Sequence, residues 1–236
     1  MATAKDIVLR PITAAEARRI IKTHHYSGKV VNNSNLHIGV FLNGNLEGAM
    51  QLGPPLDKRK LIGLVEGTGW ANMMELNRMA FSDRLPRNSE SRALAVLAKV
   101  LRKHAPQVKW IVSFADGTQC GDGTIYRAAG YDLTAIKPSE NLARFPNGTV
   151  VHKMTVETDS VSPRPEAGGK SYADVTGGRY NWRKYVKACG GEIIPGYQLR
   201  YVKFIDPTWR SRLTVPVLPY SEIERRGAGM YLGEKR

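Results

Sequence analysis

The chain has 236 residues, of which 42% are hydrophobic and 24% charged, and this composition is ordinary for a globular protein that buries a core. No apolar run approaches the roughly 18 to 20 residues of a membrane-spanning helix, and the N-terminal sequence lacks the pattern of a secretory signal. Only two cysteines, Cys120 and Cys189, are present, too few for a disulfide framework. We therefore expect a soluble cytoplasmic protein with reduced thiols and no membrane contact.

The charge is strongly basic, because 35 Lys and Arg residues against 21 Asp and Glu residues give +14 and a pI near 9.9. Residues 1–156 carry 21 basic and 12 acidic residues, and residues 157–236 carry 14 and 9. Such an excess suits a polyanionic partner, with nucleic acid first among the candidates. The alternative is a basic protein whose charge only maintains solubility.

The N-terminal third predicts a strand, a helix and a hairpin in that order. DIVLRPI (6–12) reads as a strand, and the capping-box spacing of Thr13 and Glu16 starts a helix that runs to about Lys22. Two apolar runs then flank Asn43-Gly44-Asn45. The Asn-Gly dipeptide is favoured at hairpin turns. A β-hairpin is expected there.

The central third predicts a strand, a helix, a second strand and a short helix. MMELNRMAF (73–81) reads as a strand, and apolar residues recur at helical spacing between Asn88 and His104. The β-branched and aromatic run VKWIVSF (108–114) follows and places Asp116 at the C-terminal end of a strand, where α/β sheets bind ligands. A helix over about 123–129 should then end at Gly130.

The last third changes in character. YDLTAI (131–136) and TVVHKMTV (149–156) should complete the sheet, whereas the Pro-, Gly- and Ser-rich segment at 158–178 resembles a linker. The sequence thus predicts an α/β core over residues 1–156 and a basic extension over 157–236. The extension either contacts DNA or packs on the core.

The order of these elements, with a final helix containing Y-x-x-x-G-Y (Tyr126 to Tyr131), resembles the GNAT acyltransferase superfamily. The resemblance implies a mixed, mostly antiparallel sheet flanked by helices, and a loop before the long helix that binds the donor's pyrophosphate through backbone N–H groups. Here that loop, RLPRNSESR, has no glycine. The residues that would contact the donor are Arg78, Arg87, Asn88, Ser89 and Ser91.

A closer resemblance rests on the segments HHYSGKVVNNSN, GAMQLGPP, ELNRMAFSD, RNSESRAL and SFADGTQCGDGTIYRAAGY, which are similar to the Mom family. The resemblance implies a phage enzyme that converts adenine in double-stranded DNA to N6-(carbamoylmethyl)adenine and so protects phage DNA from host restriction. It further implies action in the cytoplasm of the infected bacterium. The family's activity-linked positions correspond to His25, Tyr26, Asp116 and Tyr126.

These four residues suit an attack by the exocyclic amine of adenine, which is a poor nucleophile. Asp116 or His25 would accept the proton of the amine. Tyr126 would donate a hydrogen bond to the developing oxyanion or the leaving group, and Tyr26 would do the same or stack on the base. The alternatives are a structural histidine and tyrosines that serve only in packing.

Basic and aromatic residues provide candidates for DNA contact, and base flipping would expose the adenine amine. Tyr180, Trp182 and Tyr185 alternate with basic residues in a segment that could instead be an amphipathic helix packed on the core. A solvated charge run is the alternative for the cluster near residue 59. The candidate DNA contacts are Lys58, Arg59, Lys60, Arg179, Trp182, Arg183, Lys184, Arg210 and Arg212.

A metal site is not expected. Iron has been proposed for the Mom family, and His24, His25, His37, Asp116 and Asp122 could supply ligands, but no pair shows the H-x-x-x-H spacing of a helical metal site. Cys120 ranks behind Asp116 as a nucleophile, because no base is evident beside it.

The identity of the donor stays open between two molecules. Acetyl coenzyme A supplies the two-carbon unit without the nitrogen, whereas a glycyl ester on tRNA contains every atom of the added group, and tRNA would be a second polyanionic partner. Two other functions remain as alternatives: an acetyl-CoA-dependent N-acetyltransferase, and a non-catalytic DNA-binding accessory protein.

Overall fold

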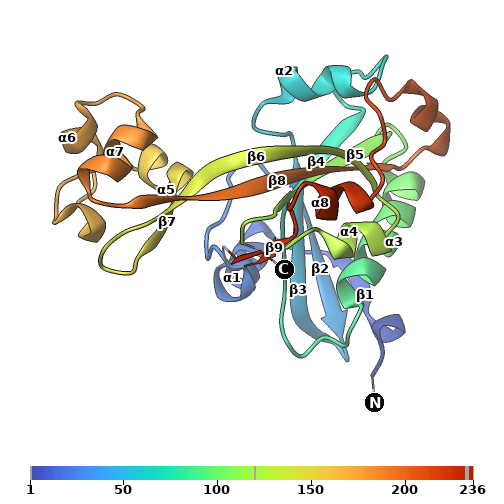
Figure 1. The fold of residues 1–236 in the computed structure, drawn as a ribbon. Helices are drawn as coiled ribbons and strands as arrows, with labels where there is room; N and C mark the ends of the chain where they lie inside the picture. The colour runs from blue at the N-terminus through green and yellow to red at the C-terminus, as the bar shows by residue number, and fades with distance from the viewer. Residues whose placement is uncertain (1, 120, 232–233, 236) are drawn as a thin grey trace. The chain divides into compact units, whose positions relative to one another are not determined.

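The predicted N-terminal elements are confirmed in the computed structural model, which describes residues 2–119, 121–231 and 234–235 (Figure 1). The Thr13 side chain accepts a hydrogen bond from the Glu16 backbone N–H, and the Glu16 carboxylate accepts one from Thr13, so the predicted capping box is present. Asn43 and Gly44 adopt positive φ angles of 50° and 82° at the hairpin turn. The elements are η1 (Ala4–Asp6), β1 (Val8–Pro11), α1 (Ala14–His24), β2 (Leu36–Leu42) and β3 (Asn45–Gly53).

The central elements follow the predicted order. The helix expected from Asn88 begins one residue later and buries its apolar stripe, including Leu94, Leu97 and Leu101. Gly130 lies in the left-handed region with φ 71°, as expected where a helix ends. The elements are α2 (Lys58–Leu61), η2 (Ile62–Leu64), β4 (Met73–Phe81), α3 (Ser89–His104), β5 (Trp110–Asp116) and α4 (Thr124–Ala128).

The C-terminal elements differ from the prediction in two places. The strand expected over 149–156 stops at His152, because the His152 ring accepts a hydrogen bond from the Met154 N–H and begins a helix. The expected linker at 158–178 contains short helices and the buried Tyr172. The elements are β6 (Asp132–Arg144), β7 (Val150–His152), α5 (Lys153–Thr158), η3 (Pro165–Ala167), α6 (Tyr172–Thr176), α7 (Trp182–Ala188), β8 (Glu192–Phe204), η4 (Pro207–Arg212), α8 (Ser221–Arg225), β9 (Met230–Tyr231) and β10 (Glu234–Lys235).

Eight strands form a mixed sheet in the order β1-β2-β3-β4-β5-β8-β6-β7, and the two short strands β9 and β10 pair separately. The pairs β1·β2, β2·β3, β3·β4 and β6·β7 are antiparallel, and β4·β5 is parallel. The expected α/β architecture with a mostly antiparallel sheet and flanking helices is therefore confirmed. No helix of the described residues is both long and apolar enough to cross a bilayer.

The chain divides into two compact units, and the division does not fall at the predicted boundary between residues 156 and 157. The first unit contains Met1–Ala115, Gly123–Ala135 and Leu199–Glu222, and the second contains Asp116–Asp122, Ile136–Gln198 and Ile223–Arg236. The long strands β6 and β8 contribute residues to both units. Strand β7 and most of β6, which were predicted to belong to the core, lie in the second unit. The second half of β8, which was predicted to belong to the extension, lies in the first unit.

Helix α1 packs on the sheet of the first unit through small and branched side chains. Ala17, Ile20 and Ile21 are buried against Ala49 of β3 and Ala80 of β4. Ala49 and Ala80 are paired across the two strands, so their side chains lie on the same face. This face of the sheet is the α1 face.

The second unit has its own apolar core. Trp182 is 5% exposed, and its ring stacks on the buried Tyr185 with centroids 6.1 Å apart. The Trp182 indole N–H donates to the Glu140 carbonyl at 2.8 Å. The packing alternative therefore holds for Trp182 and Tyr185, and a stacking contact of Trp182 with DNA bases is corrected, because the ring has almost no free surface. Arg183, exposed beside it, pairs with the Glu140 carboxylate at 2.6 Å.

We predict that Trp182→Ala destabilises the protein by about 3–5 kcal/mol, because it leaves a large cavity and an unpaired carbonyl. Arg183→Ala, the control next to it, should change stability by less than about 1 kcal/mol, since exposed ion pairs contribute little. Urea denaturation followed by fluorescence would measure both. Equal stability of Trp182→Ala and wild type, with DNA binding lost, would instead support the stacking role.

Candidate active site

Strand β4 has a β-bulge, a point at which it contains one residue more than the paired strand β3. Gln51 of β3 is paired with Arg78, but the next residue, Leu52, is paired with Leu76, so Asn77 is an extra residue in β4. Such a bulge changes the direction of side chains along a strand. Glu75 is paired with Gly53, and Gln51 and Gly53 share a face, so Glu75 and Arg78 lie on one face although they are three residues apart.

That shared face is the α1 face, and its character changes along the strands. Beneath α1 it is apolar, as at Ala49 and Ala80. Further along β3, toward Gly53, it carries Gln51, its cross-strand neighbour His37, and Arg78. Gln51 is fully buried and its amide nitrogen lies 3.2 Å from His37 Nδ1. A polar region therefore follows the apolar one on the same face.

The polar loop before β2 covers this region. Ser34 Oγ donates to Asn77 Oδ1 at 2.9 Å, and Asn33 Nδ2 donates to the Pro54 carbonyl at 2.6 Å. A Cβ at Gly53 would lie 2.2 Å from the Asn33 carbonyl oxygen, so only glycine allows the loop to pass this closely over β3.

His25 caps the C-terminus of α1 and faces this region. Its Nδ1 accepts the backbone N–H of Ser27 at 3.2 Å and lies 2.8 Å from Ser27 Oγ. Burial, assisted by the positive charge of Arg78, lowers the pKa of His25 to about 4. The ring is thus neutral at pH 7, and with Nδ1 accepting, its proton lies on Nε2. At this pH His25 is a hydrogen-bond donor through Nε2, and its low pKa makes it a weak base, so its predicted role as the base stays a prediction.

Glu75 is a half-buried carboxyl group in the same region and was missed by sequence analysis. Burial raises its pKa to about 7, although the Arg78 charge and a hydrogen bond from the Asn77 side chain both act to lower the pKa. The Arg78 guanidinium donates to the backbone carbonyls of Asn77 at 2.8 Å and Lys29 at 3.3 Å. The structure therefore places the predicted donor-binding residue Arg78 beside His25 and Glu75.

Tyr26 and Tyr126 differ in exposure. Tyr26 is 56% exposed and its ring lies 4.3 Å from that of His25, centroid to centroid. Tyr126 is 8% exposed and packs against Tyr131 and Tyr201 at 5.3 and 5.2 Å. Tyr26 thus presents an aromatic face on which a base could stack, whereas the Tyr126 ring belongs to the core of the first unit.

Asp116 ends β5 as predicted and belongs to the second unit. Its carboxylate accepts the Thr118 N–H at 3.1 Å, and its carbonyl accepts the Gln119 N–H at 3.1 Å, so it closes a tight turn. Thr118 packs against Gly196, where a Cβ would approach the Thr118 side chain to 1.8 Å. Asp116 therefore has a local structural role in addition to any chemical one. Cys120 lies outside the described residues.

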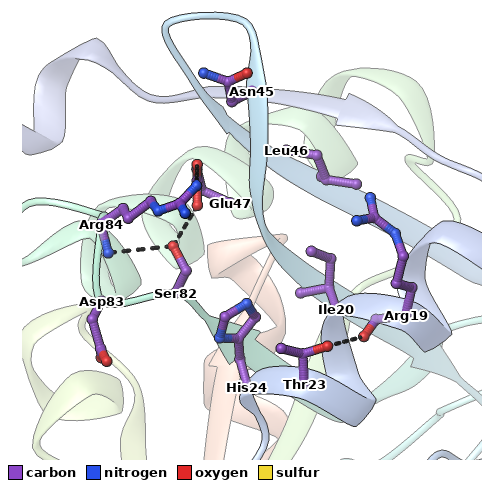
Figure 2. A pocket seen from close by; sticks show the side chains of 10 residues that line it. All are labelled: Arg19, Ile20, Thr23, His24, Asn45, Leu46, Glu47, Ser82, Asp83 and Arg84. Carbon is purple, nitrogen blue, oxygen red and sulfur yellow. Dashed lines mark hydrogen bonds and ion pairs between the residues drawn. The ribbon is translucent and has the colours of Figure 1, made fainter.

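A separate cavity of about 640 Å³ is lined by the C-terminal half of α1, the start of β3 and the residues that follow β4 (Figure 2). The His24 ring points into it, and Ser82 Oγ donates to the buried carboxylate of Glu47 at 2.5 Å. Arg84 pairs with the same carboxylate at 3.5 Å. His24 and His25 thus face different surroundings, as expected for adjacent histidines.

The predicted donor loop leads into α3 without a side-chain cap. Asn88 is the N-cap of α3 with a left-handed φ of 72°, and its side chain makes no cap hydrogen bond. The Ser89 hydroxyl donates to the Pro86 carbonyl at 2.6 Å, and the Ser91 hydroxyl to the Asn88 carbonyl at 3.2 Å. Both hydroxyls bind backbone locally, and Arg87 is exposed.

Two of the predicted DNA-contact segments lie side by side in the first unit. Val65 forms an antiparallel bridge with Leu213, and the Glu66 N–H donates to the Arg212 carbonyl at 2.8 Å. The paired segments, residues 58–70 and 207–214, each carry a cation over a tryptophan ring. Lys58 Nζ lies 4.2 Å from the Trp70 centroid, and the Arg212 guanidinium carbon lies 4.4 Å from that of Trp209.

The other predicted DNA contacts fall into two groups, cations in ion pairs and cations at the surface. Arg210 makes a bidentate ion pair with the Asp132 carboxylate, both contacts at 2.9 Å, and Lys60 forms an ion pair with Asp57 at 2.5 Å. Arg59, Arg179 and Lys184 are exposed. In the part of the chain that the structure describes, no three His, Cys, Asp or Glu side chains are grouped to hold a metal ion.

Comparison with known proteins identifies relatives over nearly the whole chain. The model of the Mom protein family matches residues 6–222. The methylcarbamoylase Mom of Escherichia phage Mu is 44% identical over 221 residues, which span 92% of this chain and 84% of that protein.

Solved structures give weaker similarities. The ribosomal-protein-S18-alanine N-acetyltransferase of Escherichia coli aligns with a TM-score of 0.41 at 11% identity, covering 84% of this chain and 94% of its own. A GNAT family acetyltransferase of Elizabethkingia anophelis with acetyl-CoA bound aligns with a TM-score of 0.43 at 13% identity, covering 84% and 98%. Similarities at this level assign neither a donor nor an acceptor.

We predict that His25 stays neutral down to about pH 5 in the folded protein, because burial holds its pKa near 4. The unfolded chain binds this proton near pH 6.5, so His25 lowers folding stability as the pH falls from about 7 to 4. Histidine ring NMR shifts against pH would measure the pKa directly. Arg78→Gln should raise it only partly, since burial remains, and an ordinary His25 pKa in wild type would contradict the assignment.

Proposed function

The chain belongs to the Mom protein family, and on this basis we propose that it is a DNA-modification enzyme that adds a carbamoylmethyl group to the exocyclic amine of adenine. The observation that carries the proposal is the 44% identity to a methylcarbamoylase over 92% of the chain. The net charge of +14 supports a polyanionic substrate. Its site of action would be the cytoplasm of an infected bacterium.

The polar region on the α1 face supports a role in acyl transfer. A neutral His25 with its proton on Nε2 would donate to an oxyanion or to a ring nitrogen of the base. Tyr26, exposed beside it, would stack on an adenine that has left the duplex, where its amine is no longer paired with thymine. Asp116 stays a candidate for the base, and Tyr126 keeps its proposed role as a hydrogen-bond donor.

The donor would be an activated acyl group. Attack of the adenine amine on a glycyl ester of tRNA forms a glycyl amide, which has the same atoms as the carbamoylmethyl product and could rearrange to it. Attack on acetyl coenzyme A would transfer two carbons without the nitrogen. Arg87 and the N-terminus of α3 would face the donor phosphates in either case.

The paired segments would contact DNA. Lys58, Arg59 and Arg212 would neutralise phosphates, and Trp70, 64% exposed, would lie against a sugar or base. In the second unit, Arg179, Arg183 and Lys184 are exposed and remain candidates.

We predict that nucleosides from bacteria expressing the wild type contain carbamoylmethyladenine by mass spectrometry, and that Asp116→Asn and Tyr126→Phe reduce it at least about 100-fold. Thr118→Ser serves as a control in the same turn as Asp116. Acetylated protein or metabolites without modified adenine would favour an N-acetyltransferase. Tight DNA binding with no modified adenine would favour an accessory protein.

We predict that purified protein modifies DNA with charged glycyl-tRNA, because the glycyl group contains every atom added. Acetyl coenzyme A alone is the comparison, and uncharged tRNA is the control. Formation of the product with acetyl coenzyme A and not with glycyl-tRNA would exclude glycyl-tRNA as the donor.

We predict that Lys58→Ala weakens DNA binding and reduces the slope of log K against log salt by about 1, as loss of one phosphate contact requires. Trp70→Ala should weaken binding without changing the slope. Lys99→Ala, on the exposed side of α3, is the matched control. Fluorescence anisotropy at several salt concentrations would measure all three, and equal losses in Lys99→Ala would argue against a specific surface.

A further inference from the structure

We propose that Glu75 is the residue that accepts the proton of the attacking adenine amine, an assignment that rests on the proposed function. The geometry of β4 carries it. The bulge at Asn77 places Glu75 on the α1 face together with Arg78, whose guanidinium donates to the Lys29 carbonyl in the loop that follows His25. In an unbulged strand, residues three apart point to opposite faces, and these two charged groups would be separated by the sheet.

The position of Glu75 in the sheet is also distinctive. The parallel pairing of β4 with β5 runs from Met73 and Trp110 to Glu75 and Val112, and β4 then continues to Phe81. Glu75 is therefore the last residue of β4 that is paired with β5. Both strands continue past this pair without further pairing to each other, so Glu75 lies at the end of the paired stretch.

The groups around Glu75 suit a proton acceptor. Asn77 donates a side-chain hydrogen bond to it and is itself held by Ser34. Arg78 is the nearby positive charge, and His25 is neutral. Burial raises the pKa of Glu75 to about 7, and a general base works best near this value, because a large fraction of it is ionised at neutral pH while the carboxylate is still strongly basic. A histidine with a pKa near 4 is a much weaker base.

The reaction step balances without a further reagent. The adenine nitrogen attacks the acyl carbon of the donor ester or thioester, and a C–N bond forms. The N–H proton moves to the Glu75 carboxylate. As the bond from the acyl carbon to the leaving oxygen or sulfur breaks, that atom takes the electron pair and then the proton from Glu75, which returns to the carboxylate form.

The test combines activity with a direct titration. Glu75→Gln keeps the size and hydrogen bonds of the side chain but cannot take a proton, and Glu75→Asp keeps the carboxylate on a shorter chain. Glu192→Gln, an exposed glutamate at the start of β8, is the matched control. Initial rates of adenine modification would be measured from pH 5.5 to 9 with saturating DNA and donor. Thermal melting would confirm that each variant folds.

We expect the wild-type rate to rise with pH to a plateau, with its midpoint near pH 7 and with Glu192→Gln unchanged. Glu75→Gln should lose at least about 100-fold in rate and the acidic limb of the profile, with DNA affinity preserved. Glu75→Asp should recover part of the rate and keep a limb. A folded Glu75→Gln variant with the wild-type profile would overturn the proposal.

The carboxyl titration separates this proposal from the proposed function. In protein with ¹³C-labelled glutamate, one carboxyl resonance should titrate near pH 7 in the wild type and be absent in Glu75→Gln. Its presence together with a wild type that modifies no adenine would overturn the proposed function, and with it the role of Glu75 toward adenine, whereas a fully active Glu75→Gln variant would overturn the Glu75 assignment alone. Its absence would overturn the Glu75 assignment even if the wild type modifies DNA.

Discussion

The extra residue in β4 is the constraint on which the candidate active site depends. Because Asn77 has no partner in β3, the side chains of Glu75 and Arg78 emerge on the same face of the sheet. The Asn77 side chain then links the strand to the covering loop through Ser34. Gly53 is required at the same point, since any side chain there would collide with the loop backbone. Removing the bulge would separate the charged groups and displace the loop.

Burial in this region lowers the pKa of His25 and raises the pKa of Glu75, so the two groups affect folding stability with opposite dependence on pH. His25 is kept neutral, so it destabilises the fold as the pH falls from about 7 to 4. Glu75 holds its proton in the folded state to about pH 7 but only to about 4.5 when unfolded, so it destabilises the fold as the pH rises between these values. Arg78 lowers both pKa values. The arrangement is costly for stability, as is common where residues are positioned for chemistry.

The second unit has a core built from aromatic residues that alternate with surface cations. Tyr172, Trp182 and Tyr185 are buried together, which leaves Arg183 and Lys184 at the surface. The pattern of alternating aromatic and basic residues is therefore explained by an amphipathic helix. In the first unit the pattern is different, because Trp70 is largely exposed and has a lysine over its ring. Only burial distinguishes these two cases.

The sequence by itself determined the features set by local chemistry. The capping box at Thr13, the turn at Asn43 and Gly44, the apolar stripe of α3 and the family motifs all depend on residues close together in the chain. Tertiary structure decided the rest. A bulge depends on the pairing with the partner strand, so the sequence alone identified Glu75 only as a residue within a predicted strand. The tautomer of His25, the burial of Trp182 and the pairing of residues 58–70 with 207–214 likewise depend on contacts between distant segments, which spacing along one chain does not encode.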